Sequence, residues 1–513
     1  MFLRYSRLVF MLVNLIILSV SAQEVAQANK MRGGGTLSLA SVEKRFNAFL
    51  AAGKHDEAVA FAKRFAVQKR VSDSYRQDVF LLLTMEALEN GHNAEYEEYI
   101  ELAKEVDVSF GHYLNMIHFF EKSDSSTSLD SFIWLATNHH SKLNNINSQF
   151  IFQIFRTLKS DPEKQFRFLK SLFSFGYQSE RLPEYSSFFY VELARLYLEK
   201  NEVSQAENVA DTFINQFSDN ILIWHDRQFE KLWRFQFQKG NFDPAKAIAK
   251  YIIRVEQALE NTSELTWDEW IRGSRVLVEK YLSLGKTEQA INIATNALEQ
   301  IPEEYKENDS ALWLTQALIS AYEQAGEWDS ARRTSQNLLQ INVESNSIMI
   351  NFIINYSGLL WRSNYSNEAL VVADKILTKY KKFANSYGLY IARAVKACVL
   401  TELNRNKEAK QIFDEMKQVA ENNYVATIEA GLCTKDYDSV AQIIIQRLNE
   451  PDERKYVLAS FSTYLVNGLS QKEFKFYQAY QKLLDREDIK KQVRRYGRVK
   501  KWSLPASYWL KMF

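Results

Sequence analysis

The chain alternates apolar and polar positions with the period of an α-helix along most of its length. The clearest segment is residues 276–302, VLVEKYLSLGKTEQAINIATNALEQIP. Leu277, Val278 and Tyr281 share one face of a first expected helix, which Gly285 ends. A second expected helix carries alanines on one face and stops at a proline: Ala290, Ala294, Ala297 and Pro302. The segment therefore predicts two antiparallel helices joined by a tight turn.

A small residue recurs at the phase of Ala290 at intervals of 38 to 45 residues. Two helices in close contact need a small side chain where their backbones approach. One helix pair cannot cover its own apolar face, so the pairs are expected to stack into a continuous core. The recurring positions are Ala206, Ala245, Ala290, Ala331, Ala369 and Ala409, and a further copy near the start has Gly53, Ala58 and Ala62.

The Tyr, Gly, Ala and Pro positions of residues 276–302 resemble a tetratricopeptide repeat (TPR). The resemblance implies an all-α fold, a right-handed superhelical solenoid of stacked antiparallel helix pairs. It also implies a non-catalytic scaffold or adaptor for protein–protein interaction. Exported relatives commonly serve envelope assembly, secretion or polysaccharide export, and the resemblance implies a role of that type.

The composition agrees with one continuous helical array. The 513 residues include only 16 glycines and 6 prolines, and no Gly-, Ser- or Pro-rich linker divides the chain after its first residues. The expected parts are an export signal over 1–22, a disordered leader over 23–37, degenerate TPR-like repeats over 38–186, recognisable repeats over 187–420, further helix pairs over 421–488 and a basic aromatic tail over 489–513.

The N-terminus has the pattern of an export signal. Arg4 and Arg7 precede an apolar run that is shorter than the roughly 20 residues of a membrane span. Ala22 would precede the cleavage point, so that the mature chain would begin at Gln23. We therefore expect a periplasmic or secreted protein, and the alternative is an uncleaved signal that anchors a sensor to the membrane.

The chain has two cysteines, Cys398 and Cys433, which lie 35 residues apart. That spacing is close to one repeat, so the two residues are expected to be able to lie side by side on successive helices. Helix packing seldom brings two β-carbons to the roughly 4 Å that a disulfide requires. Two buried thiols are therefore the favoured expectation, and a disulfide is the alternative.

No catalytic constellation is recognisable. The sequence lacks a Gly-rich phosphate loop, a Gly-x-Ser-x-Gly elbow, a His-Glu-x-x-His helix and a Cys-x-x-Cys pair. Its seven histidines do not have metal-ligand spacing. We expect no enzyme activity, no cofactor and no metal. The alternative is a regulator, or a helical part, of an envelope enzyme that processes peptidoglycan or another glycan.

A ligand groove is expected on the first helix of each pair, at the phases that packing does not use. These phases are rich in arginine and tryptophan, which are enriched in binding hot spots. They predict a site for a peptide or a partner protein, and the alternative is a salt-bridged surface with tryptophans packed between pairs. The candidate residues are Arg195, Arg227, Glu230, Arg234, Arg275, Trp313, Gln316, Trp361 and Arg362.

The formal charge of +1 results from oppositely charged regions that nearly cancel, because residues 23–488 carry −9 and the tail is strongly basic. The tail is interpreted either as a terminal cap whose aromatic residues dock on the last helices or as an arm for an anionic membrane surface or an acidic partner. Nucleic acid is not expected as a partner of an exported protein. The candidate tail residues are Lys490, Lys491, Arg494, Arg495, Arg498, Lys500, Lys501, Trp502 and Trp509.

Overall fold

The computed structural model describes residues 38–68, 71–121, 124–139, 143, 148–177, 184–214, 223–238, 243–260 and 265–506. The expected export signal, the leader and Trp509 lie outside these residues. The chain forms two compact units, Met1–Leu196 and Tyr197–Phe513, which are described separately below. None of the helices in the described ranges has the length and hydrophobicity that a membrane crossing requires.

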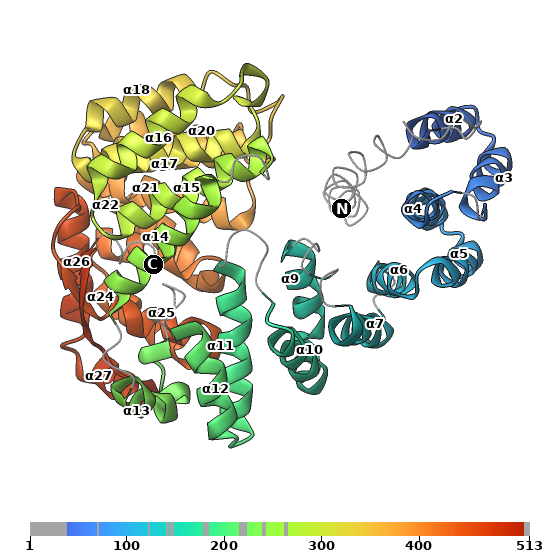
Figure 1. Cartoon of the computed structure of the whole chain (residues 1–513). Coiled ribbons are helices and arrows are strands. Elements are labelled where there is room, and N and C mark those ends of the chain that lie inside the picture. Colours follow the sequence, from blue (N-terminus) through green and yellow to red (C-terminus); the bar gives the residue numbers. More distant parts are fainter. Residues whose placement is uncertain are drawn as a thin grey trace. The chain divides into compact units, whose positions relative to one another are not determined.

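Unit 1 consists of helices in the described ranges, and along residues 39–138 each helix packs against the next (Figure 1). Its core includes Ala58 and Ala62, which are fully buried at the phases that the sequence predicts. The helices are α2 (Leu39–Ala51), α3 (His55–Ala66), α4 (Asp73–Glu89), α5 (Asn93–Val106), α6 (Val108–Glu121), α7 (Ser125–Asn138), α9 (Ser148–Thr157), α10 (Pro162–Ser174) and α11 (Glu184–Glu199), the last of which crosses into unit 2.

Unit 2 is an array of antiparallel helix pairs followed by a C-terminal segment that contains two short strands. The helices of the pairs are α12 (Val203–Ile214), α13 (Glu230–Gln238), α14 (Pro244–Glu260), α15 (Trp267–Ser283), α16 (Thr287–Gln300), α17 (Asp309–Ala325), α18 (Trp328–Leu338), α19 (Met349–Arg362), α20 (Ser366–Leu377), α21 (Ser386–Glu402), α22 (Asn406–Met416), α23 (Tyr424–Cys433) and α24 (Tyr437–Asn449). The C-terminal segment contains α25 (Pro451–Ser460), β1 (Thr463–Leu465), α26 (Gln471–Leu483), α27 (Glu487–Tyr496) and β2 (Lys501–Pro505).

The turns inside the five pairs from α15 to α24 have a repeated backbone conformation. The first or second residue after the first helix adopts a positive φ, which glycine tolerates best and asparagine tolerates better than most residues. The positions are Gly285, Gly326, Asn364, Asn404 and Lys435. These turns bring the two helices of each pair into antiparallel contact and confirm the predicted all-α array of helix pairs.

The predicted small residues lie where the helices approach each other, with one exception. Ala206, Ala290, Ala331, Ala369 and Ala409 are all fully buried.

The exception is Ala245. It lies in the first turn of α14 and is partly exposed, whereas Ala247 is buried in its place. The prediction for Ala245 was wrong because the buried face of α14 contains Pro244, Ala247 and Ile248, and Ala245 lies off that face.

The expectation of two free thiols was also wrong. Cys398 on α21 and Cys433 at the end of α23 form a disulfide, with their α-carbons 5.0 Å apart. Both helices are the first members of their pairs and pack side by side. The predicted neighbourhood of the two cysteines is therefore confirmed, and the helices approach closely enough for the bond.

The C-terminal segment returns to the beginning of unit 2. Strands β1 and β2 pair in parallel, and Gly497 forms an antiparallel bridge with Asp226. Figure 1 shows α27 beside the region of α13, in agreement with the contacts of α27 with the 3-10 turn Arg227–Phe229. We call this connection between residues 223–233 and 497–506 the clasp.

His225 is the centre of the clasp. Its Nε2 accepts a hydrogen bond from Trp502 Nε1 at 3.1 Å, and its Nδ1 lies 3.0 Å from the carbonyl oxygen of Arg498. This pattern requires a neutral ring with its proton on Nδ1. Complete burial lowers the pKa of His225 to about 3, which keeps the ring neutral.

The Arg498 side chain completes the clasp. Its guanidinium lies 3.7 Å from the centre of the Trp233 ring, and its Nε donates to the carbonyl oxygen of Trp224. The end of the chain is thereby attached to residues more than 260 positions earlier in the sequence.

Candidate binding cavity

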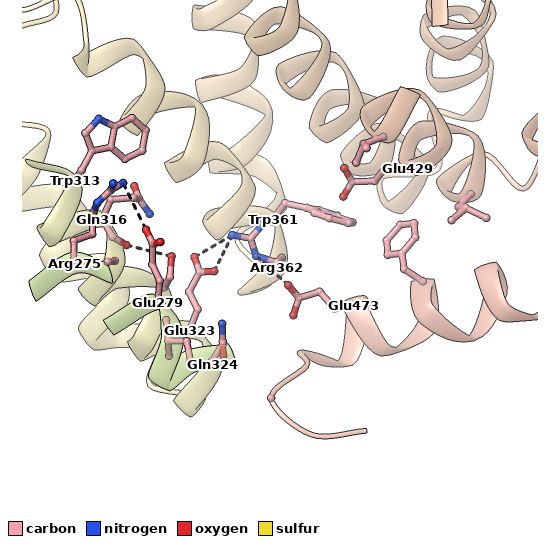
Figure 2. Close-up of a pocket in the computed structure, with 17 residues that line it drawn as sticks. Arg275, Glu279, Trp313, Gln316, Glu323, Gln324, Trp361, Arg362, Glu429 and Glu473 are labelled. Carbon is pink, nitrogen blue, oxygen red and sulfur yellow. Dashed lines mark hydrogen bonds and ion pairs between the residues drawn. The ribbon is translucent and has the colours of Figure 1, made fainter. Parts of the chain in front are cut away.

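A cavity of about 610 Å³ lies in unit 2 and is lined mainly by the first helices of four pairs, α15, α17, α19 and α23. Helix α15 contributes Arg275 to its lining, and α17 contributes Trp313 and Gln316. Helix α19 contributes Trp361 and Arg362, and further lining residues come from α23 and α26 (Figure 2). The cavity therefore combines four first helices with one helix of the C-terminal segment.

Five of the nine predicted groove residues line this cavity, namely Arg275, Trp313, Gln316, Trp361 and Arg362. They share it because equivalent phases of stacked helices face the same side.

The other four predicted groove residues lie elsewhere. Arg195 belongs to unit 1 and pairs with Glu192 at 2.8 Å. Arg227 and Glu230 belong to the clasp, and Arg234 follows it directly on α13. Arg227 donates a hydrogen bond to the carbonyl oxygen of Arg494 on α27.

Both arginines of the cavity are paired with glutamates. Arg362 makes two hydrogen bonds to Glu323 through one nitrogen, at 2.8 and 3.0 Å. Arg275 lies 3.6 Å from Glu279, one turn further along α15. Burial alone would lower the pKa of Arg362, but the surrounding carboxylates, chiefly Glu323, raise it above its usual value.

Two further glutamates line the cavity and are not among the residues predicted from the sequence. Glu473, in the first turn of α26, lies 3.7 Å from Arg362 Nε and accepts a hydrogen bond from the Ser470 backbone. Glu429 lies on α23, where burial raises the pKa of its carboxyl to about 7, with Glu473 raising it further and Arg362 lowering it. A signal for Glu429 was present, because it is the one charged residue in the otherwise apolar helix YVATIEAGLC.

The two predicted tryptophans are parts of the cavity wall. Trp361 is only 3% exposed, donates its Nε1 hydrogen to Glu402 and packs edge-on against Phe476 at 5.5 Å. Trp313 is partly buried, and its ring centre lies 5.0 Å from that of Phe352. These contacts keep the wall apolar between the charged pairs.

The predicted tail residues divide into docked and exposed groups. Arg498 and Trp502 belong to the clasp, and burial, together with Arg498, lowers the pKa of Lys500 to about 8. Lys490 pairs with Glu487 at 3.1 Å. The exposed members are Lys491, Arg494, Arg495 and Lys501.

One group in unit 1 could hold a divalent metal ion. Glu86 at the end of α4, His92 and Glu95 at the start of α5 place their ligand atoms within 4.8 Å of one another. Glu86 Oε1 accepts hydrogen bonds from His55 and Asn90, whereas the buried Oε2 has no donor among the described residues. The spacing of the histidines does not reveal this group, because its ligand atoms come from two helices and the turn between them.

Comparisons with known proteins give only remote likenesses. No protein-family model matches the chain, and no curated protein sequence matches it. Among solved structures, the Rap conjugation gene regulator of plasmid pLS20 in complex with the Phr* peptide is 15% identical with a TM-score of 0.31, covering 69% of this chain and 96% of that chain.

Two further structures have lower scores. The P58(IPK) TPR domain is 14% identical with a TM-score of 0.18, covering 80% of this chain and 98% of that chain. A circular tandem repeat protein with novel repeat topology is 15% identical with a TM-score of 0.14, covering 95% of this chain and 96% of that chain. With such scores, these likenesses carry no argument about a ligand.

Proposed function

We propose that the protein is a non-catalytic scaffold that binds a peptide, or an extended segment of a partner protein, in the cavity of unit 2. The observation that supports this most is the convergence of four first helices on one cavity of about 610 Å³. Cavities that take small ligands and peptide side chains measure about 300–1,000 Å³ and combine an apolar wall with a few polar groups. The wall here is formed by Trp361 and Phe476, and the polar groups are carboxylates, guanidinium groups and amides.

Polar atoms with unused hydrogen-bonding capacity support a peptide as the ligand. Arg275 Nε, Arg362 Nε and Gln324 Oε1 are buried and have no hydrogen-bond partner in the described part of the chain. A buried polar atom without a partner costs about 1–3 kcal/mol. Main-chain carbonyl and amide groups of a bound peptide would remove this cost, because they offer both acceptors and donors.

We also propose that the protein acts outside the cytoplasm, in the cell envelope or beyond it. The signal-like N-terminus and the Cys398–Cys433 disulfide support this location, since disulfides persist in oxidising compartments. A role in envelope assembly, secretion or polysaccharide export rests on the family resemblance alone.

A library of random peptides displayed on phage tests the binding function. Peptides selected on the full-length protein should lose binding to the Ser320→Trp variant, because Ser320 lines the cavity on α17 and an indole would fill it. Asn296→Trp is the matched control, since Asn296 lies on the exposed face of α16. Selected peptides that bind Ser320→Trp as well as the parent protein would contradict the proposal.

A further inference from the structure

The cavity carries an excess of negative charge. Two arginines and four glutamates line it, which gives a formal charge of −2 when all are ionised. Each arginine is neutralised by a glutamate, since Arg362 binds Glu323 and Arg275 lies beside Glu279. The charges that remain are those of Glu429 and Glu473.

Glu429 has no cation of its own. Its side chain makes no hydrogen bond or ion pair with any residue in the described ranges, and the nearby Arg362 is committed to Glu323. Lys472 precedes Glu473 on α26, but its ammonium binds the carbonyl oxygen of Trp361 and the carboxylate of Glu402. A carboxylate in such surroundings is stabilised most by a cation that arrives with a ligand.

The apolar residues around Glu429 favour a ligand cation that carries methylene groups. The same cavity is lined by Leu432 and Val425 on α23 and by the rings of Trp361 and Phe476. A low local dielectric strengthens the attraction between a carboxylate and a cation. The same apolar surface would contact the methylene groups of a lysine or arginine side chain.

We propose that the cavity binds a cationic group of its ligand, an ammonium or a guanidinium, with Glu429 and Glu473 as the counter-ions. The inference rests on the proposed function for the identity of the ligand as a peptide. The same chemistry is also present in free amines, which the experiment below separates from peptides.

Positional-scanning peptide pools provide the test. Each pool fixes one amino acid at the central position of a heptapeptide, and binding to the full-length protein is measured by fluorescence polarisation. Pools with a fixed arginine or lysine should bind at least tenfold more tightly than pools with aspartate, glutamate or alanine, because a charge-assisted hydrogen bond contributes about 1.5–3 kcal/mol. Spermidine and arginine amide form a second arm as competitors.

The variants Glu429→Gln and Glu299→Gln complete the design. Glu429→Gln keeps the shape of the side chain and should reduce the preference for basic pools about tenfold or more. Glu299→Gln is the matched control on the exposed face of α16 and should leave the preference unchanged.

The outcomes separate the two proposals. Equal binding of acidic, neutral and basic pools, with loss in Ser320→Trp, would overturn the cationic site and leave the peptide-binding function intact. Binding of the free amines without binding of any pool would support the cationic site and contradict peptide binding. Preference for basic pools that survives Glu429→Gln would overturn the role of Glu429, and failure of every probe would overturn both proposals.

Discussion

Replacing Glu429 by glutamine should stabilise unit 2 at neutral and alkaline pH. Burial raises the pKa of this carboxyl from 4.5 to about 7 in the folded protein, so the folded state holds the proton more tightly than the unfolded state. Ionisation therefore costs stability as the pH rises from the unfolded-state value to about 7. Above that pH the cost is constant.

The size of the effect follows from the same pKa difference. One pKa unit corresponds to about 1.4 kcal/mol, so the full cost of the ionised Glu429 is about 3 kcal/mol. Glutamine does not ionise, and Arg362 keeps its two hydrogen bonds to Glu323 in the variant. We expect Glu429→Gln to gain about 1–3 kcal/mol near pH 8 and close to nothing near pH 4.

Native-state hydrogen exchange measures the gain in stability of Glu429→Gln at α23, the helix that carries the substitution. Peptides from α23 report the free energy of opening in unit 2 without contributions from unit 1. The parent protein, Glu429→Gln and the control Glu299→Gln are compared with one another at each pH, which cancels the intrinsic dependence of exchange on pH. Equal protection of Glu429→Gln and the parent near pH 8, or a gain that is as large near pH 4, would refute the reasoning.

Three further predictions concern the disulfide, the clasp and the N-terminus. Reduction of the Cys398–Cys433 bond, or Cys398→Ser with Cys433→Ser, should lower the stability of unit 2 by about 4 kcal/mol, as expected for a closed loop of this length, and urea unfolding with and without reductant measures the loss. Gly497→Ala should open the clasp, because the alanine β-carbon would lie 2.0 Å from the His225 carbonyl oxygen. Amide hydrogen exchange of residues 498–506 should then be faster than in a Val499→Ala control. Unchanged exchange would contradict the prediction. The mature protein should begin at Gln23, which intact-mass analysis of the exported protein tests, and a mass that includes residues 1–22 would instead support the membrane anchor.

The sequence predicts the helix pairs well because their determinants are local. A small residue such as Ala331 and a left-handed turn residue such as Gly326 occur at fixed positions of a pair, whichever pair precedes or follows it. The phases of the first helices also place Arg275, Trp313 and Arg362 in one cavity.

The charge of the cavity was not predictable in the same way. The phases of the first helices predicted the arginines, and salt bridges were the alternative expectation, but not which glutamates pair with them. Glu473 comes from α26, outside the repeats. Pairings across large sequence separations, such as that of His225 with Trp502, leave no periodic pattern. The strands β1 and β2 were not predicted either. They have only three and five residues, and they stabilise each other only when the chain has folded.

The clasp has a mechanical consequence for unit 2. In an open stack of repeats, each end repeat contacts only one neighbour. Such a stack therefore unfolds first at its less stable terminus. In unit 2 the clasp joins residues 497–506 to residues 223–233, so unfolding of either end also breaks contacts of the opposite end. Pulling on the chain ends should therefore give one large rupture event, where an unclasped stack would give a series of small steps.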